Sequence, residues 1–194
     1  MSNSFTKEER AHIRKKLIEK GFQRLKTGGI KAVNIEELTN SCYVAKGTFF
    51  NLFSNKSEYL YQMMREKRSQ TKEKLQEYLD EEGKLTYEGL YQYLKWMCAE
   101  NPNIFSYLTE QETKWLVSKW PVEYLENEDK DEDTAKWIIS FLKTPKQTPD
   151  WELFCNFLKL SAWALGSREF LLAHAFEPTI DTLIINACDS ICEK

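Results

Sequence analysis

Apolar side chains recur three and four residues apart along most of the chain, and this period predicts α-helices and an all-α fold. The first helix is expected to follow Thr6, which forms a capping box with Glu9, and to end at Gly28-Gly29. The residues of its predicted buried face are Ile13, Leu17, Ile18, Gly21, Phe22 and Leu25.

The stretch from Asn34 to Phe53 predicts a helix-turn-helix. Asn34 and Glu37 are spaced as a second capping box, which starts a short helix. The predicted buried residues of that helix are Ile35, Leu38 and Cys42. Tyr43 and Val44 leave room only for a sharp turn. In the second helix, the predicted inward residues are Val44, Phe49 and Phe53, and the exposed ones are Lys46, Gly47, Thr48 and Asn51.

The rest of the chain is also predicted to be helical. Asn55 and Glu58 are expected to cap a long helix that Gly83 stops, and Asp150 is expected to cap a later one. An acidic run at 126–133 is expected to be a solvated loop rather than a calcium site, because it lacks the EF-hand spacing, and 143–149 a linker. The expected helices lie at about 56–80, from 87 to a break at Asn101-Pro102, and at 103–120, 137–142, 151–176 and 178–192.

The helix expected after Asp150 is apolar nearly all round between Phe154 and Leu165. A helix of this kind needs burial on both sides, and a second subunit can cover one of them. We therefore predict a symmetric dimer whose interface is a four-helix bundle built from the last two helices of each chain. The alternative is that both helices are buried within one subunit.

Charge is distributed unevenly along the 194 residues, whose net charge is −3. Residues 1–60 contain 11 Lys and Arg against 6 Asp and Glu, a balance of +5, and the remainder has a balance of −8. The basic end is the end with the helix-turn-helix. This asymmetry favours a DNA-facing segment, since phosphate contacts supply most non-specific affinity. An ordinary solvated basic helix is the alternative.

Residues Cys42–Phe53 and Asn55–Glu58 together resemble the DNA-binding motif of the tetracycline-repressor-like (TetR) transcriptional regulators. The resemblance covers about residues 6–60. Three positions depart from the family pattern: Tyr43 stands at the usual turn glycine, Ala45 at the usual capping serine and Phe50 at the usual phosphate-binding tyrosine.

The resemblance implies an N-terminal three-helix DNA-binding head at 1–55 on a C-terminal helical ligand-binding and dimerisation body at 56–194. The helix that follows the motif would join the two and change the spacing of two heads when it tilts. The resemblance also implies that Thr48, Asn51 and Lys56 contact phosphates, the last with help from backbone N–H groups at its helix N-terminus.

Few side chains of the second motif helix can hydrogen-bond to base edges. Lys46 can donate to guanine O6 and N7, and Thr48 can contact a thymine methyl group. Tyr43 is a further candidate contact at the turn, and Gly47 completes the DNA-facing surface. Phe50 lacks the hydroxyl group expected at its position, and we expect it to pack against Leu52 and the first helix.

The body is rich in aromatic residues, most of which are expected to be core. A helical body with several large rings, Met97 and polar residues such as Glu110, Gln111 and Glu112 can also enclose a cavity for an apolar or aromatic ligand. Rings and carboxylates both attract cations, so a cationic ligand is one candidate. The candidate ligand-binding residues are Tyr93, Trp96, Met97, Phe105, Trp115 and Trp163.

The sequence offers little support for catalysis, metal binding or cofactor binding. Its two histidines, His12 and His174, are far apart, and no Gly-rich phosphate loop, nucleophile elbow or metal-ligand spacing occurs. The five cysteines lack a CxxC spacing, although Cys188 and Cys192 share one helical face. The N-terminus has no signal-peptide pattern and no apolar run is long enough to span a membrane, so we expect a cytoplasmic protein.

These observations favour a ligand-responsive transcriptional regulator. It would be a repressor that binds a palindromic operator on double-stranded DNA as a homodimer and is released by a small molecule. A second hypothesis is a helical ligand-binding or interaction module that has lost specific DNA binding, as the residues at positions 43, 45 and 50 suggest. An enzyme that uses a cavity in the body is a third.

Overall fold

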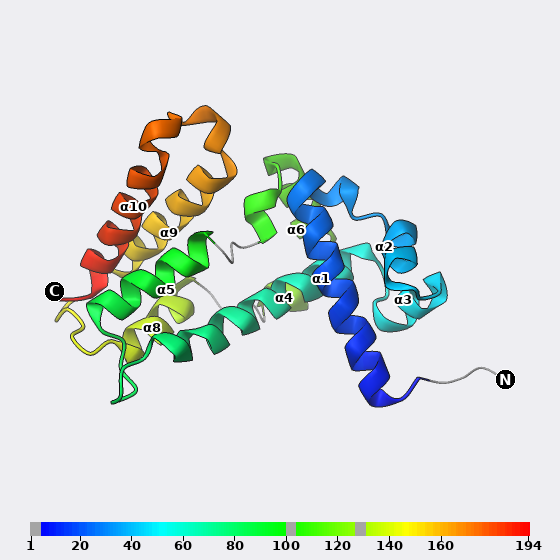
Figure 1. Ribbon diagram of the computed structural model, residues 1–194, viewed down its shortest axis with the longest axis horizontal. Helices are drawn as coiled ribbons and strands as arrows, with labels where there is room; N and C mark the ends of the chain where they lie inside the picture. Colours follow the sequence, from blue (N-terminus) through cyan, green and yellow to red (C-terminus); the bar gives the residue numbers. More distant parts are fainter. Residues whose placement is uncertain (1–4, 100–103, 127–130) are drawn as a thin grey trace. The chain divides into compact units, whose positions relative to one another are not determined.

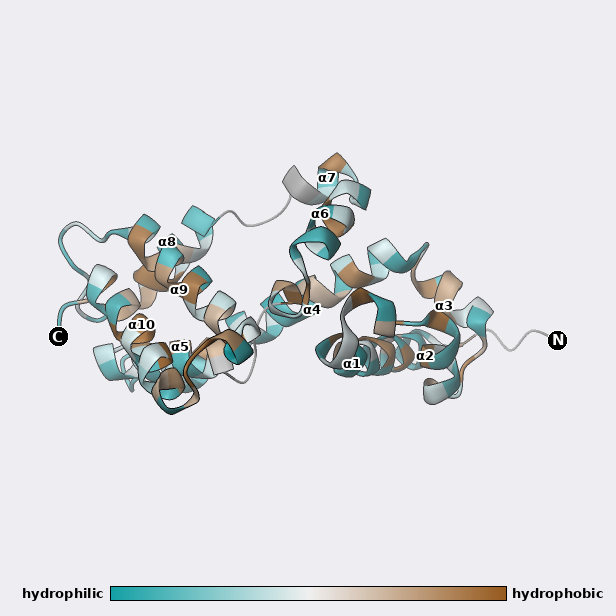
Figure 2. Ribbon diagram, turned by 90° about the horizontal axis from the view of Figure 1, so that it is seen from above, coloured by the Kyte–Doolittle hydropathy of each residue, from teal (hydrophilic) through white to brown (hydrophobic). Residues whose placement is uncertain are grey.

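The computed structural model describes residues 5–99, 104–126 and 131–194. Ten α-helices and no β-strand occur within these ranges, which confirms the all-α prediction (Figure 1). The helices are α1 (Lys7–Ala32), α2 (Ile35–Cys42), α3 (Lys46–Leu52), α4 (Lys56–Leu75), α5 (Tyr87–Ala99), α6 (Glu110–Lys119), α7 (Val122–Glu126), α8 (Asp131–Phe141), α9 (Trp151–Gly166) and α10 (Phe176–Ile191). Figure 2 shows apolar and polar residues alternating along them.

The chain forms two compact units. The first comprises Met1–Glu66 with Tyr107–Leu125, and the second Lys67–Ser106 with Glu126–Lys194. The helix α4 therefore contributes to both units. The functional division predicted between residues 55 and 56 stays a prediction, because compactness does not assign binding roles.

The first unit is built on α1, which packs against α2, while α2 packs against α3 (Figure 1). The predicted capping box of Thr6 and Glu9 is confirmed, and Gly28 and Gly29 interrupt the helical backbone as expected. Tyr59 of α4 fills the centre of the unit and donates a hydrogen bond of 2.6 Å from its hydroxyl to the Leu17 carbonyl. Its ring packs 5.1 Å and 4.9 Å, centroid to centroid, from the rings of Phe49 and Phe53. This cluster fixes α3 to α1 and α4.

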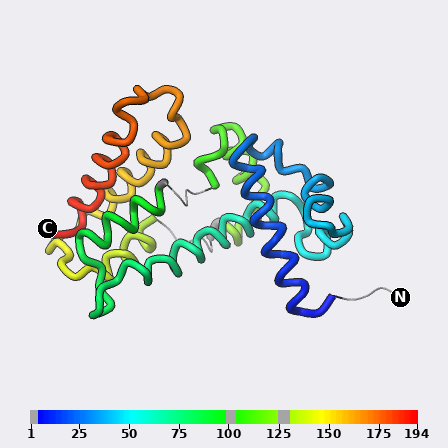
Figure 3. The backbone as a smooth tube through the Cα atoms, in the orientation of Figure 1, coloured from blue at the N-terminus to red at the C-terminus, as the bar shows by residue number. Residues whose placement is uncertain are grey.

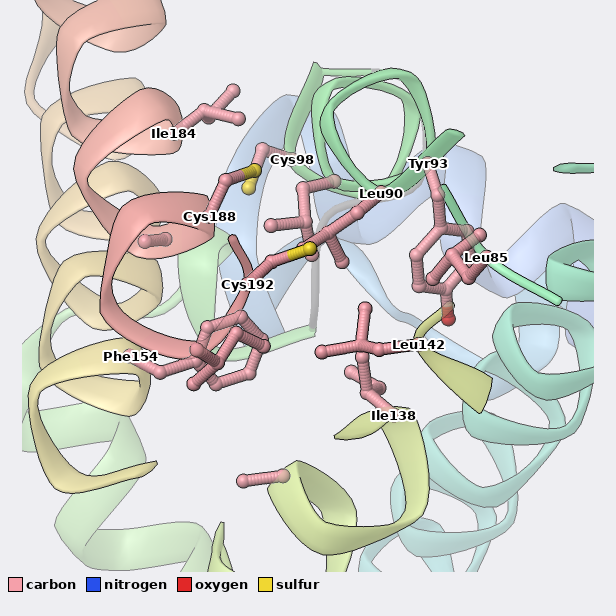
Figure 4. Packing of buried hydrophobic residues seen from close by; sticks show 14 of the residues in the cluster. Leu85, Leu90, Tyr93, Cys98, Ile138, Leu142, Phe154, Ile184, Cys188 and Cys192 are labelled. Carbon is pink, nitrogen blue, oxygen red and sulfur yellow. The ribbon is translucent and has the colours of Figure 1, made fainter. Parts of the chain in front are cut away.

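The second unit encloses a core between α5, α8, α9 and α10 (Figure 4). The helices α9 and α10 run side by side as a hairpin (Figure 3). Gly166, at the end of α9, allows a close approach of two backbone segments, since a Cβ atom there would lie 2.9 Å from the Ser106 carbonyl oxygen. The core residues labelled in Figure 4 are Leu85, Leu90, Tyr93, Cys98, Ile138, Leu142, Phe154, Ile184, Cys188 and Cys192.

Two of the predicted long helices are in fact interrupted. The helix expected at 103–120 is a 3-10 turn, Ile104–Tyr107, followed by α6. Thr109 separates them because it is extended and its hydroxyl caps α6, forming a capping box with Glu112. The helix expected at 151–176 ends at Gly166, and two 3-10 turns precede α10, which begins at Phe176 rather than at 178.

The boundaries of two other elements also differ from the prediction. The helix α4 ends at Leu75 and continues as a 3-10 turn, so it stops short of residue 80. Asp131–Asp133, expected in an acidic loop, form the first turn of α8, where negative charge is favourable. Lys159 of α9 pairs with Asp131 and helps to hold this turn. Residues 127–130 of the expected loop and the break expected at Asn101-Pro102 lie outside the described residues.

Candidate nucleic-acid interface

Local capping defines the start of the helix-turn-helix. The Asn34 side chain accepts hydrogen bonds from the backbone N–H groups of Glu36 and Glu37 at 2.9 Å and 3.2 Å, which confirms the predicted cap. The Glu37 carboxylate does not complete a capping box. It pairs with Arg24 of α1 instead and so ties α2 to the first helix.

The turn between α2 and α3 is formed by Tyr43 in the left-handed region, with φ 59° and ψ 40°. The backbone N–H of Val44 then donates to the Thr39 carbonyl at 3.0 Å. The Tyr43 side chain is 91% exposed, and the Lys16 ammonium lies 5.5 Å from its ring centroid. Glycine is the residue best suited to this backbone conformation, so the tyrosine adds strain. The TetR-family pattern has a glycine at this position, and a glycine would avoid this strain.

Replacing Tyr43 with glycine is expected to raise the free energy of unfolding by about 0.5–1 kcal/mol, because the backbone strain is relieved. Urea unfolding of Tyr43→Gly measures the gain. The matched control is Tyr43→Ala, which removes the ring but retains the Cβ atom and hence the strain. Equal stability of the two variants would show that the turn is not strained.

The exposed face of α3 consists of four residues. Helical geometry places Gly47, Phe50 and Asn51 on the side of α3 away from the buried Phe49, with Lys46 beside Phe50 at the border of this face, and all four are exposed. Thr48 lies at the edge of this face and is half-buried. The structure thus brings together Tyr43, Lys46, Gly47, Thr48 and Asn51 of the predicted DNA-binding set, on one continuous turn and helix.

Phe50 does not pack as expected. It is 46% exposed, and its neighbour is Phe49, whose ring it meets edge-on at a centroid distance of 5.4 Å. The reason is its helical phase, since Phe49 and Phe53 already occupy the inward positions and are both buried. The face of α3 that we assigned to DNA therefore includes an aromatic ring, which the sequence-based interpretation placed elsewhere.

Hydrogen bonds from α1 help to fix the position of α3 in the first unit. Arg10 of α1 donates to the Asn51 backbone carbonyl at 3.3 Å, and Arg14 donates to the Gln62 side chain of α4 at 2.7 Å. Ala45 caps α3 without a side-chain hydrogen bond, as its departure from serine implies. Long-range contacts from α1 and the aromatic cluster therefore compensate for the missing cap.

Lys56 has an internal hydrogen-bond partner. Its ammonium donates to the Ile30 carbonyl at 2.6 Å, while the Ile30 N–H donates to the Glu112 carboxylate at 3.0 Å. Burial lowers the pKa of Lys56, and the charge of Glu112 partly offsets that effect. Burial acts to raise the pKa of Glu112, but hydrogen bonds from Thr109 and Ile30 outweigh it and hold the pKa below its usual value. Lys56 and Glu112 thus clamp the peptide groups of Ile30, which follows the glycine break in α1.

This geometry predicts a structural effect for Lys56→Ala. Removing the donor from the Ile30 carbonyl is expected to lower the free energy of unfolding by about 1 kcal/mol. If the clamp is the main role of Lys56, the slope of log affinity for DNA against log salt stays unchanged, whereas a phosphate contact would reduce the slope by about one. Lys46→Ala is the matched control, since Lys46 is exposed and its loss is expected to leave stability unchanged.

The candidate ligand-binding residues occupy several places. Tyr93, Trp96 and Met97 belong to α5, Phe105 to the 3-10 turn Ile104–Tyr107, Trp163 to α9, and Trp115 to α6 of the first unit. The rings of Tyr93 and Trp96 stack, with centroids 6.3 Å apart. Tyr93 is fully buried and donates its hydroxyl to the Thr71 carbonyl at 3.1 Å, whereas Trp163 is 61% exposed. The structure thus brings Tyr93 and Trp96 together, and their ligand-binding role stays a prediction.

The buried cysteines favour a structural role. Burial raises the pKa of the Cys98 and Cys188 thiols to about 12, and it also raises that of Cys192. Protonated thiols are poor nucleophiles and poor metal ligands. Among the described residues, no group of three or more His, Cys, Asp or Glu side chains is arranged to hold a metal ion.

None of the helices in the described ranges is both long and apolar enough to cross a membrane.

Comparisons with known proteins support the fold. No family model matches the sequence, and neither does any curated protein. Solved structures do match over nearly the whole chain. The reduced form of NemR from E. coli is 16% identical, with a TM-score of 0.62 over 94% of this chain and 98% of that one.

Two further structures have similar scores. A TetR-family transcriptional regulator from Haemophilus influenzae RD is 17% identical, with a TM-score of 0.59 over 95% of this chain and 98% of that one. A TetR-family regulator from Marinobacter aquaeolei VT8 is 15% identical, with a TM-score of 0.55 over 97% and 100% of the two chains. The resemblance predicted from residues 42–58 is therefore confirmed as a TetR-family fold.

Proposed function

We propose that the protein is a DNA-binding transcriptional regulator that acts in the cytoplasm and recognises its operator with the exposed face of α3. The observation that carries the proposal is this exposed face on a helix-turn-helix within the basic end of the chain, held by a packed aromatic cluster. A short exposed helix on a rigid support is the usual arrangement for entering a DNA major groove. Lys46 and Thr48 would contact base edges, Tyr43 would contact DNA at the turn, and Thr48 and Asn51 would also contact phosphates.

The regulator would bind a palindromic operator as a homodimer. Apolar side chains are exposed on the α9–α10 hairpin, and they support an interface there. Leu160 and Trp163 of α9 are 49% and 61% exposed, and Ile185 of α10 is 40% exposed. Leu160 and Trp163 are three residues apart and share one face of α9, and exposed apolar side chains that lie together suit an interaction site. Two-fold symmetry of the protein would then match two half-sites on one face of the duplex.

We further propose that a small effector bound to the second unit releases the protein from DNA, so that it acts as a repressor. An apolar or aromatic effector suits the stacked Tyr93 and Trp96 of α5. A cationic effector would compete with Lys74, whose ammonium lies 5.7 Å from the Trp96 ring centroid. The effector needs only a few kcal/mol of differential affinity between two conformations of the dimer.

The second candidate is an interaction module without specific DNA binding. The strained Tyr43, the uncapped Ala45 and the exposed Phe50 favour it, because each differs from the family pattern within the recognition surface. This candidate predicts weak, sequence-independent binding with a steep salt dependence, since only phosphate contacts would remain.

Selection from random duplexes by the purified full chain distinguishes these functions. It should be run at two salt concentrations, with the mass measured by size-exclusion chromatography. We expect enrichment of one palindromic site by a dimer. Enrichment that is weak and lost at the higher salt would instead support the interaction module and direct attention to ligands of the second unit.

A further inference from the structure

We infer that Phe50 recognises thymine methyl groups in the major groove, so that operator binding depends on the methyl itself. The inference rests on the proposed function and adds a specificity determinant to it. It concerns a position where the family tyrosine is replaced, and where the hydroxyl needed for a phosphate contact is absent.

The position of Phe50 on α3 is central. With 3.6 residues per turn, it lies between Lys46 on one side and Gly47 and Asn51 on the other. Its side chain is 46% exposed although the helix has buried positions nearby, which Phe49 and Phe53 fill. Phe50 is therefore not part of the buried core of the first unit, and it projects from the same face as the charged Lys46.

The ring of Phe50 is held in place. It meets Phe49 at an interplanar angle of 85°, and Phe49 in turn packs against Phe53 and Tyr59 at centroid distances of 5.2 Å and 5.1 Å. A ring supported in this way loses little conformational freedom on binding. This makes it a suitable fixed apolar contact.

The chemistry of the DNA major groove indicates which group the Phe50 ring would contact. Base edges in the major groove present hydrogen-bond donors and acceptors, and the C5-methyl group of thymine is the apolar feature among them. A phenylalanine ring placed against polar edges would remove water from them without replacing its hydrogen bonds. Placed against a methyl group, the ring buries apolar surface on both sides.

Charge complementarity identifies DNA as the occupant of this face. Lys46 lies next to Phe50, and residues 1–60 have a balance of +5. Gly47 leaves open space beside the ring, since no atom lies within 4 Å of a Cβ atom built there. An apolar ring, a lysine and an open backbone patch together suit close approach to a T-containing major groove.

The test replaces thymine with deoxyuridine, one position at a time, in the operator obtained by selection. This change removes the methyl group and leaves phosphates and base pairing intact. We expect binding to weaken about fourfold at one or two positions of each half-site, as the loss of one buried methyl implies. Phe50→Ala should remove the difference between thymine and uracil at those positions, whereas Phe50→Leu, which stays apolar, should retain a difference there. A thymine methyl contacted by Thr48 would lie at another position, and its effect should persist in Phe50→Ala.

The control variant is Phe170→Ala, which removes a phenylalanine that is 79% exposed in the second unit. It should discriminate thymine from uracil as the unmodified protein does. Circular dichroism and thermal unfolding confirm that each variant is folded before binding is compared.

The outcomes separate this inference from the proposed function. Specific operator binding without any effect of uracil would overturn the role of Phe50 and leave the regulator intact. The role of Phe50 would also be overturned if Phe50→Ala kept an undiminished preference for thymine at the affected positions. Failure to obtain any specific duplex would overturn both.

Discussion

Gly47→Ala is expected to weaken operator binding about tenfold or more while making the fold slightly more stable. Gly47 lies within α3, where alanine is favoured over glycine by about 1 kcal/mol. No protein atom lies within 4 Å of a Cβ atom built at this position, so the folded chain has room for the methyl group. The first unit therefore gives no packing reason for a glycine on the recognition helix, and close approach of DNA supplies one.

The measurement combines urea unfolding with operator binding. A matched control is Gly83→Ala, because Gly83 also has open space around a built Cβ atom but adopts φ +71° in a turn. Its replacement should reduce stability by about 1 kcal/mol and leave operator affinity unchanged. If Gly47→Ala is more stable and binds the operator normally, the face of α3 that carries Gly47 does not approach the duplex closely.

The features predicted correctly from sequence depend on neighbours a few residues away. Thr6 with Glu9, Asn34 and Asp150 all cap helices as expected, because a cap involves only the first turn that follows it. The helix-turn-helix has the same local character. Its spacing of apolar residues and its turn were enough to place five candidate DNA contacts on one surface.

The features that were missed depend on contacts between distant segments or on short irregular turns. Lys56 has its partner at Ile30, 26 residues earlier in the chain, so sequence spacing gave no sign of the clamp. The spacing of Thr109 and Glu112 is that of a capping box and could have been recognised in the sequence, but the apolar residues on both sides suggested one continuous helix. Phe49 and Phe53 were correctly placed inward from the sequence, but Phe50 was expected to pack as well, because its apolar side chain gave no sign that these two rings already fill the buried positions of the short helix.

Leu160→Glu is expected to dissociate the proposed dimer and weaken operator binding about a hundredfold or more. Leu160 and Trp163 lie on the exposed face of α9, together with Leu153, which is 43% exposed. In the bundle that we propose, these side chains are buried against the partner, and an unpaired carboxylate there would have to lose its water. The single chain should still fold, because 49% of the Leu160 surface is exposed to solvent.

The loss of DNA affinity follows from the loss of linkage between two heads. A monomer makes the contacts of one half-site, whereas in a dimer the second head binds at a high effective concentration. Size-exclusion mass and operator titration test both consequences on the same sample. Val122→Glu is the matched control, since Val122 is 63% exposed at the start of α7, outside the α9–α10 hairpin, and a carboxylate suits a helix N-terminus. If Leu160→Glu remains dimeric and binds the operator as before, the interface lies elsewhere, and the apolar face of α9 must be covered by something other than a second copy.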